Sequence, residues 1–341
     1  MNPVTRISFP FTLLLIAFLA LSIATGQSPE KVSTDDKIRL GVDLVVLDAL
    51  VLQQKSARPV GDLKKEDFTL FEDGVKQEIT HFGRDTMPLS VLLLIDRGGC
   101  LDPFGEEVRH ATTEALDRLK PDDEVAMMAF HDTTELVQGF TRNRNRLVDA
   151  LGRMPPHEEN AGHCFNRAFY DAARYMERAG NPDGRRVIIV ITGVTTGFEC
   201  SGPSIEEAHM KVLESGSVVC GLIPKSTEQR MESGVMRAAA GIAGLFKVRS
   251  SGLNKLAEET GGEVLSDKPE VLDHAFNTLV DHLRTRYSLG FVSSNPQRDG
   301  TFRKVRLEIA PTVLKRRESE GKLVVKTRRG YVASRVRPGR I

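Results

Sequence analysis

Strands that alternate with helices between residues 90 and 286 constrain the fold of this chain more than any other feature. The first strand, 90–96, is a run of aliphatic residues, and the strand 186–192 is equally apolar. Continuous apolar runs of this length are typical of parallel strands buried on both faces. Further strands are expected at 124–130, 134–137, 217–223 and 263–265, with helices at 104–119, 143–153, 166–179, 204–215, 252–260 and 270–286 and an extra helix within 226–250. The alternation predicts an α/β fold with a doubly wound, mostly parallel sheet.

Asp96 ends the first strand and is followed by Gly98 and Cys100. The carboxyl ends of parallel strands form the edge at which α/β folds bind ligands. An aspartate in this position can also simply cap the helix that follows. Asp96 is therefore a candidate site residue, with capping as the alternative.

Alternating strands flank the α/β unit on both sides. Before it, residues 38–52 read as strand, and residues 66–82 read as a hairpin around Asp73-Gly74. After it, residues 287–292, 301–309 and 322–327 alternate in the same way. Neither set can bury a core alone, so we expect them to pair into a small β-domain.

The N-terminus predicts export. Arg6 precedes an apolar run over residues 9–24, and a plausible cleavage site follows at Ala24-Thr25-Gly26. An uncleaved membrane anchor is the alternative, although the run is slightly short for a span of about 20 residues. The predicted organisation is a signal peptide at 1–26, a disordered linker at 27–37, an N-terminal β segment at 38–86, the α/β domain at 87–293 and a basic C-terminal β segment at 294–341.

Charge says little about the partner. The net charge is +1, so no specific nucleic-acid partner is indicated. Residues 298–341 carry 14 Lys and Arg residues against 4 Asp and Glu residues. This excess fits a solvated strand face or attraction to polyanions or an anionic membrane.

The chain has four cysteines, Cys100, Cys164, Cys200 and Cys220. None has the C-x-x-C spacing of a zinc or redox site, and an exported chain meets an oxidising environment. Structural disulfides are therefore expected, with three complete pairings open.

Motifs around the α/β unit carry a family resemblance. They are Lys65-Glu66-Asp67-Phe68, Phe71-Glu72-Asp73-Gly74 with Gln77, Leu256-Ala257-Glu258-Glu259-Thr260-Gly261-Gly262, Leu283-Arg284-Thr285-Arg286-Tyr287-Ser288-Leu289-Gly290-Phe291 and Asp299-Gly300-Thr301-Phe302-Arg303-Lys304-Val305. With these motifs, the α/β unit resembles a von Willebrand factor A domain. The arrangement over residues 38–332 resembles the VWFA-related family catalogued in acidobacterial proteins.

The resemblance implies a divalent-cation site that this sequence has largely lost. Similar domains hold Mg²⁺ with an Asp-x-Ser-x-Ser loop, a Thr from a second loop and an Asp from a third. Asp96 matches the leading Asp, but Gly98 and Cys100 occupy the two Ser positions. Arg167 falls at the Thr position and Gly193 at the position of the second Asp.

A guanidinium at the Thr position would repel a divalent ion, because it is permanently cationic and only donates hydrogen bonds. We therefore expect Arg167 to pair with Asp96 and the site to hold no metal and no other cofactor. Asn166 or Thr192 remains as a source of an oxygen ligand, which would restore Mg²⁺.

The resemblance also places three cysteines in the loops around the lost metal site. Cys100 lies in the first loop, Cys164 in the second and Cys200 in the third. A disulfide between Cys164 and Cys200 is the favoured substitute for the ion. Cys220, in the middle of a strand, is expected to be a buried small hydrophobic residue.

The leading functional hypothesis is an exported, periplasmic or secreted, non-catalytic module. It would bind a protein or extracellular polymer through the loop rim, defined as residues 97–104, 157–167 and 193–204, and would touch a membrane only through an uncleaved signal. The alternative is divalent-metal-dependent adhesion through a rearranged site. A third hypothesis is an enzyme using Cys100 with His131, His157 or His163 as base, although no catalytic motif supports it.

Overall fold

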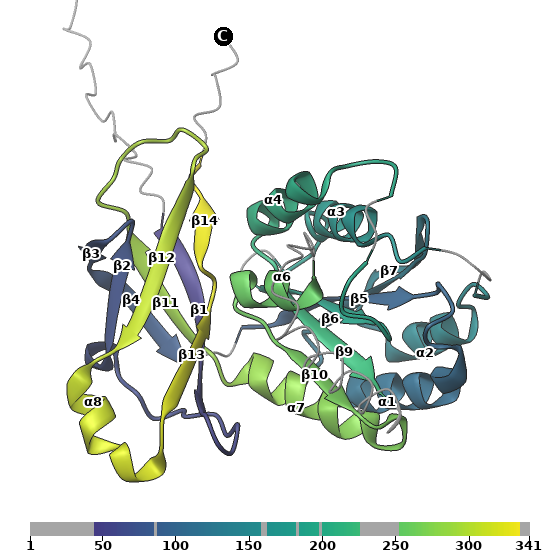
Figure 1. The fold of residues 1–341 in the computed structure, drawn as a ribbon, viewed down its shortest axis with the longest axis horizontal. Coiled ribbons are helices and arrows are strands. Elements are labelled where there is room, and N and C mark those ends of the chain that lie inside the picture. The colour runs from purple at the N-terminus through teal and green to yellow at the C-terminus, as the bar shows by residue number, and fades with distance from the viewer. Residues whose placement is uncertain are drawn as a thin grey trace, which may run out of the picture. The chain divides into compact units, whose positions relative to one another are not determined.

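The structure is a computed structural model (Figure 1) that describes residues 44–84, 87–157, 162–181, 184–197, 200–225 and 252–334. The predicted signal peptide at 1–26, the predicted linker at 27–37 and a helix expected within 226–250 lie outside the described residues. Within the described residues, no helix has both the length and the apolar content needed to cross a membrane.

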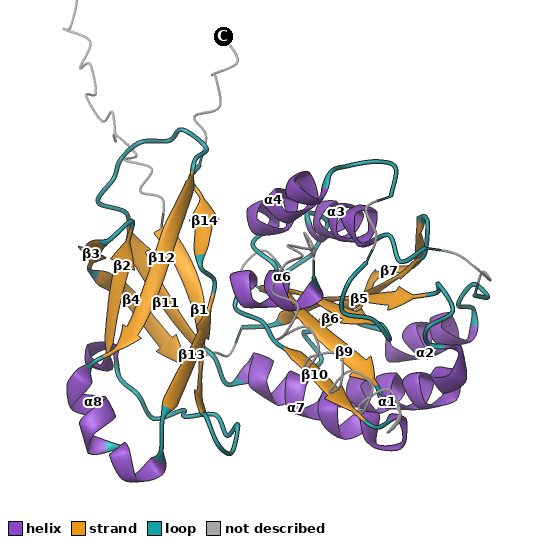
Figure 2. Cartoon of the chain, in the orientation of Figure 1, coloured by secondary structure: helices purple, strands orange, loops and turns teal. Residues whose placement is uncertain are grey.

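A six-stranded sheet forms the centre of the α/β domain (Figure 2), in the order β10-β9-β8-β5-β6-β7. Neighbouring strands from β10 to β6 are parallel, and β7 pairs antiparallel with β6 at one edge. The predicted doubly wound, mostly parallel sheet is confirmed. The strands are β5 (Leu89–Asp96), β6 (Glu124–Phe130), β7 (Thr134–Thr141), β8 (Arg185–Ile191), β9 (Val218–Pro224) and β10 (Val264–Asp267).

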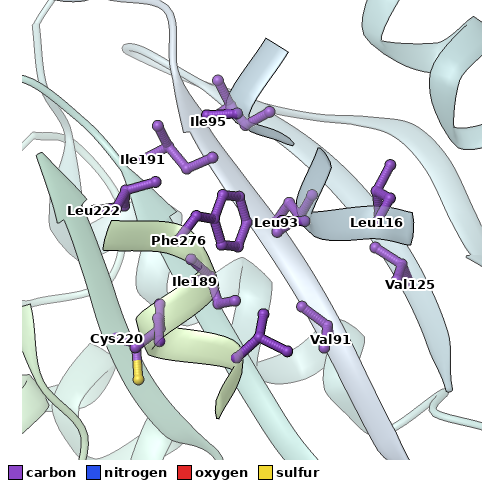
Figure 3. Close-up of a cluster of buried hydrophobic side chains, with 14 of the residues drawn as sticks. Val91, Leu93, Ile95, Leu116, Val125, Ile189, Ile191, Cys220, Leu222 and Phe276 are labelled. Atoms are coloured by element: carbon purple, nitrogen blue, oxygen red, sulfur yellow. The ribbon is translucent and has the colours of Figure 1, made fainter. Parts of the chain in front are cut away.

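Helices cover both faces of this sheet, because its central strands are apolar on both sides. One buried cluster joins the sheet to α1 (Gly105–Asp117), α2 (Arg144–Gly152) and α7 (Leu272–Arg284). Figure 3 shows part of it, with Phe276 of α7 among aliphatic side chains and Cys220. The second cluster joins the other face to α3 (Phe165–Met176), α4 (Ile205–Ser215) and α6 (Leu253–Thr260). Packing on both faces holds the central strands in place. The ends of these strands in turn set the positions where the loops at the carboxyl edge begin.

The flanking segments pair with each other, as predicted. One sheet has the order β13-β1-β11-β4, the other has the order β14-β12-β2-β3, and the two share one hydrophobic core. The Asp73-Gly74 turn joins β2 to β3, and both residues have positive φ, which Asp and Gly accept in a tight hairpin. The strands are β1 (Leu44–Gln53), β2 (Phe68–Glu72), β3 (Val75–Gln77), β4 (Ile79–Arg84), β11 (Tyr287–Val292), β12 (Phe302–Ile309), β13 (Leu323–Thr327) and β14 (Gly330–Val332).

Strand β11 pairs with β1 and β4, as expected for residues 287–292, although the predicted boundary at 293 counts these residues with the α/β domain. A short helix, α8 (Pro311–Arg316), follows β12 and was not expected. Pro311 stands at its first position, where a missing N–H costs nothing.

Candidate functional site

Three loops converge where the central strands end. Asp96 closes β5, and its neighbours across the sheet are Phe130, the last residue of β6, and β8, which ends at Ile191. The loop before α3 is tied to the end of β6, because the Cys164 N–H donates to the main-chain oxygen of His131 at 3.2 Å. The sheet register therefore places the three predicted loops together at its carboxyl edge.

Asp96 is completely buried and is surrounded by donors. The Thr192 hydroxyl donates to Oδ2 at 2.6 Å, and the Gly98 N–H donates to Oδ1 at 2.9 Å. The Nδ1 atom of His163 lies 3.0 Å from Oδ1 and 2.9 Å from Oδ2, and it must carry the proton because a carboxylate only accepts. Asp96 is thus the centre of a polar cluster and does not merely cap a helix.

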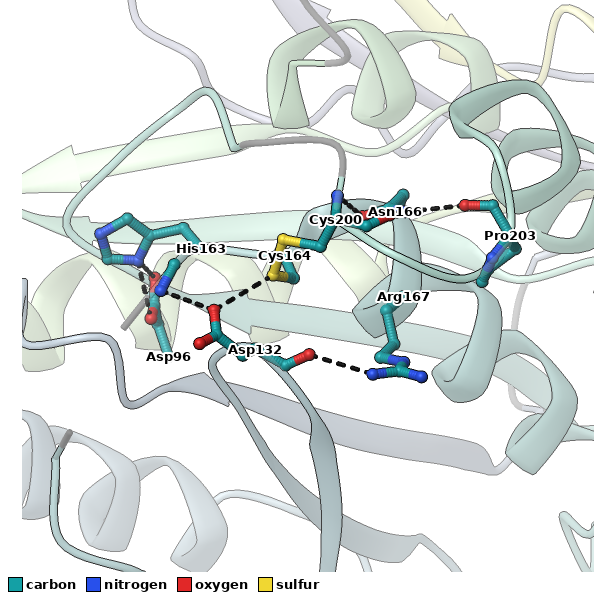
Figure 4. Close-up of a disulfide and its surroundings, with 9 residues drawn as sticks. Asp96, Asp132, His163, Cys164, Asn166, Arg167, Cys200 and Pro203 are labelled. Atoms are coloured by element: carbon teal, nitrogen blue, oxygen red, sulfur yellow. Dashed lines mark hydrogen bonds and ion pairs between the residues drawn. A yellow bond between two sulfur atoms is a disulfide. The ribbon is translucent and has the colours of Figure 1, made fainter. Parts of the chain in front are cut away.

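His163 takes the place that was predicted for Arg167 (Figure 4). Its hydrogen bond to Asp96 raises the pKa of His163 above the ordinary 6.5, so the pair gains ionic character. The Arg167–Asp96 ion pair is wrong: Arg167 Nη1 donates to the main-chain oxygen of Asp132 at 3.2 Å. The reason is local geometry, since Arg167 already belongs to α3 and His163 lies in the loop before it.

Gly98 and Gly193 are the positions that make room for this cluster. A Cβ on Gly98 would lie 2.8 Å from both Cε1 and Nδ1 of His163. A Cβ on Gly193 would lie 2.8 Å from the main-chain oxygen of Cys100 and 3.0 Å from its Cβ. The volume that larger residues would fill at these two positions is occupied by the imidazole and the cysteine.

Cys100 completes the cluster through hydrogen bonds to Asp96 and Gly193. Its thiol donates to Asp96 Oδ2 at 3.3 Å, and its sulfur accepts the Gly193 N–H at 3.1 Å. Burial, followed by the nearby charge of Asp96, raises the pKa of Cys100 to about 12. A thiol with this pKa stays protonated at neutral pH, whereas a reactive cysteine needs a lowered pKa. Two of the histidines considered as bases contact other residues. Nδ1 of His163 forms a hydrogen bond with Asp96, and Nδ1 of His157 lies 3.2 Å from Oδ2 of Asp102.

The predicted Cys164–Cys200 disulfide is confirmed, with a Cα–Cα distance of 5.4 Å (Figure 4). Cys164 is buried directly before α3, and Cys200 lies in the loop after β8. Cys220 is a buried free thiol in the apolar cluster, as expected. The disulfide therefore joins the second loop to the third beside the Asp96 cluster.

Asn166 strengthens the same connection. Its side-chain nitrogen donates to the main-chain oxygens of Cys200 and Pro203 at 2.9 and 2.7 Å, and its oxygen accepts the Cys200 N–H at 3.1 Å. Asn166 thus forms its hydrogen bonds with the third loop, and its side chain points away from Asp96 (Figure 4). Of the two residues weighed as a further oxygen ligand, only Thr192 reaches the cluster.

The donor set does not fit Mg²⁺. That ion takes oxygen ligands in near-octahedral geometry and binds through carboxylates and water. The cluster offers one carboxylate and one hydroxyl, and its other side chains are a thiol and an imidazole. Its carboxylate already accepts hydrogen bonds from four residues, so a hard cation would have to displace these bonds. The sequence suggested the loss of the oxygen ligands, and its only signal for the role of His163 was the position of that residue directly before Cys164.

A protein-family model agrees with this fold. The model of the von Willebrand factor type A domain matches residues 91–196. No curated protein matches the chain. Among solved structures, an aerotolerance-related membrane protein from Bacteroides fragilis is similar at 18% identity, with a TM-score of 0.39 over 57% of this chain and 98% of that one.

Two pilus proteins are also similar. The PilB minor pilin from Streptococcus sanguinis has 10% identity and a TM-score of 0.41, over 59% of this chain and 62% of that one. The vWF domain of the type V pili tip protein Mfa5 from Porphyromonas gingivalis has 13% identity and a TM-score of 0.28, over 33% and 39%. The family-model match, on a doubly wound sheet with its site at the carboxyl edge, establishes that this chain contains a von Willebrand factor type A domain.

Proposed function

We propose that this chain is a non-catalytic interaction module that binds a protein or extracellular-polymer partner through the loop rim of its von Willebrand factor type A domain. The proposal rests on one observation: side-chain hydrogen bonds and a disulfide connect the three loops to one another. His163 joins the second loop to Asp96, and Thr192 joins the third loop to the same carboxylate. The Cys164–Cys200 disulfide then joins the second loop to the third.

Fastened loops favour binding because less conformational freedom is lost when a partner docks. Residues of the rim remain available to a partner, since Ser201 and Gly202 are exposed. The buried polar atoms beneath them, by contrast, are occupied with one another. The rim therefore suits recognition by a preformed surface, and we propose that its binding does not require Mg²⁺.

The same geometry argues against catalysis. Cys100 is the candidate nucleophile, and its thiol donates to a carboxylate that also holds the candidate base, His163. A nucleophile–base pair needs a hydrogen bond between those two groups. We therefore propose no enzymatic activity for this site.

We further propose that the chain is exported to the periplasm or the exterior. Two observations support this: the apolar run at residues 9–24 behind Arg6, and a disulfide, a bond that is typical of oxidising compartments and rare in the cytosol. Cell fractionation of the full chain tests the proposal. Recovery with the cytoplasmic fraction, with all cysteines reduced, would contradict it.

Site-specific photo-crosslinking tests rim binding in the cells that make the protein. A photoreactive amino acid replaces Ser201 in the rim or, as a matched control, Ser319, an exposed serine in the flanking β region. We expect a recurrent high-mass adduct from position 201 and none from position 319. Adducts from position 319 alone, or from neither position, would contradict binding through the rim.

Ser201→Arg and Ser319→Arg provide the matching affinity test once the adduct has been identified by mass spectrometry. A bulky charge placed in an interface costs about 2 kcal/mol or more, so Ser201→Arg should weaken binding by about 30-fold or more. Ser319→Arg should leave the affinity unchanged. Equal affinities for the two variants would place the interface elsewhere on the protein.

A further inference from the structure

The Asp96 cluster brings together three different kinds of metal ligand. A ligand atom from each of Asp96, Cys100 and His163 lies within 4.8 Å of the others. They come from the end of β5, the first loop and the second loop. One oxygen, one sulfur and one nitrogen donor are a poor set for Mg²⁺ but a usual set for a borderline-soft ion such as Zn²⁺.

We propose that Asp96, Cys100 and His163 form a Zn²⁺ site at the position where similar domains hold a hard cation. The inference goes beyond the proposed interaction function and does not depend on it. It changes the class of ion, because the thiol and imidazole that exclude Mg²⁺ are the ligands that Zn²⁺ selects.

The separations between the ligand atoms support a shared ion. Zn²⁺ binds nitrogen and oxygen at about 2.0–2.2 Å and sulfur at about 2.3 Å, so ligands of a tetrahedral site lie about 3.3–3.8 Å apart. Cys100 Sγ lies 3.3 Å from Asp96 Oδ2, and His163 Nδ1 lies 2.9 Å from the same oxygen. Small side-chain shifts therefore suffice to surround an ion.

Neighbouring groups hold two of the three proposed ligands in place, as is usual around metal sites in proteins. The Gly193 N–H points at Cys100 Sγ from 3.1 Å, as a donor that stabilises a thiolate would. The Thr192 hydroxyl and the Gly98 N–H hold the carboxylate of Asp96.

The site is also accessible to an ion from solvent. Asp96 is fully buried, whereas the His163 side chain is 16% exposed and Cys100 is partly buried. An ion can therefore enter from the rim side. Thr192 Oγ1 or a water is available as the fourth ligand, which is the usual count for zinc.

Metal binding has a defined proton balance. The thiol proton of Cys100 leaves to solvent when the ion binds, and the ion also replaces the proton on Nδ1 of His163. From the imidazolium form that proton leaves to solvent, whereas a neutral ring takes up a proton at Nε2 in exchange, so that His163 then releases no net proton. Neither the protein nor the metal changes its oxidation state. The disulfide is not involved, because its two sulfurs are already bonded to each other.

Optical titration with Co²⁺, a spectroscopic substitute for Zn²⁺, tests the site directly. The full chain is treated with a chelator, kept oxidised and then titrated with Co²⁺. We expect a 1:1 complex with a thiolate-to-cobalt charge-transfer band, and displacement of the Co²⁺ by Zn²⁺ but not by millimolar Mg²⁺. The absence of the band, or equal displacement by Mg²⁺, would overturn the proposal.

Matched variants assign the ligands. Cys100→Ser should abolish the charge-transfer band, and His163→Gln should weaken Zn²⁺ binding, measured by calorimetry, by at least about 10-fold. Cys220→Ala removes the other free cysteine, and His157→Gln removes another imidazole of the rim, so both should bind normally. A band lost in Cys220→Ala but kept in Cys100→Ser would place the ion elsewhere. Circular dichroism of each variant separates loss of a ligand from loss of the fold.

These measurements need no partner. If Zn²⁺ binds while no adduct forms at position 201, the metal inference holds and the interaction proposal fails. An adduct without metal binding gives the opposite result.

Discussion

Gly98 is the residue on which the geometry of the site depends most. Its missing side chain lets the His163 imidazole approach the Asp96 carboxylate. A methyl group there would lie 2.8 Å from two ring atoms, well inside ordinary contact distance. The imidazole would have to move, and its hydrogen bonds to a fully buried carboxylate would break.

We predict that Gly98→Ala lowers the free energy of unfolding by about 1–3 kcal/mol, because it overfills a packed site and removes the hydrogen bonds between His163 and a buried carboxylate. Urea unfolding provides the measurement. Gly105→Ala is the control, since nothing lies within 4 Å of a Cβ on Gly105 and its φ of −58° is helical. The control should be neutral or stabilised by up to about 1 kcal/mol. Equal loss in both variants would mean that the contact with His163 is unimportant.

The sequence identified only part of the site at the level of residues. Asp96 was predicted as a candidate site residue because it follows a buried strand, and that signal is local. His163 was weighed only as a base for Cys100, and Arg167 was expected to pair with Asp96. Whether His163 or Arg167 reaches Asp96 depends on where α3 begins in space relative to the end of β5. A local sequence pattern does not determine that position. A histidine directly before the disulfide cysteine was the available signal.

At the level of elements, the Cys164–Cys200 disulfide anchors the start of α3 to the loop after β8. It closes a stretch with a sequence separation of 36 residues. Loop-closure entropy for this length corresponds to a stabilisation of about 4 kcal/mol. Asn166 adds three hydrogen bonds to the same loop, so the fastening does not depend on the covalent bond alone.

We predict that Cys164→Ala/Cys200→Ala lowers the free energy of unfolding by about 2–4 kcal/mol. Dithiothreitol should destabilise the unmodified protein by a similar amount and leave the double variant unaffected. Alkylation of the denatured, unreduced protein should label two cysteines, Cys100 and Cys220, and reduction should expose the other two. Labelling of all four cysteines before reduction would contradict the disulfide.

The order of elements in the α/β domain could be predicted because each strand and helix has its own periodicity. The run at 90–96 and the Asp73-Gly74 turn are local signals, and β5 and the β2–β3 hairpin formed as expected. Helix α8 was missed because six residues are too few for a helical period to stand out. The pairing of β11 with β1 and β4 was predicted as well, because neither set of flanking strands could bury a core alone.

At the scale of the whole molecule, buried charges couple elements that are far apart in sequence. Glu263, between α6 and β10, is 5% exposed and accepts a hydrogen bond from His282 of α7 at 2.7 Å. Lys326 of β13 donates to its other oxygen at 3.0 Å. Burial alone would raise the pKa of Glu263, but the hydrogen bond from His282 and the charge of Lys326 outweigh it and lower the pKa from 4.5 to about 2.

A lowered carboxyl pKa in the folded state means that ionised Glu263 stabilises the fold above the unfolded-state pKa. This stabilisation is fully present above about pH 4.5 and is lost as the pH falls towards 2. The shift corresponds to about 3 kcal/mol at neutral pH. Below pH 2 the carboxyl group is protonated in both states and contributes nothing.

We therefore predict that Glu263→Gln lowers the free energy of unfolding at pH 7 by about 3 kcal/mol and flattens its decline between pH 4.5 and pH 2. Urea unfolding at a series of pH values provides the measurement. Glu270→Gln is the control, because Glu270 is exposed and its loss should leave the decline unchanged. If Glu263→Gln kept the full decline, other carboxylates would govern acid unfolding. A flattened decline would show that this one buried carboxylate links α7, β13 and the end of α6 in a single pH-dependent unit.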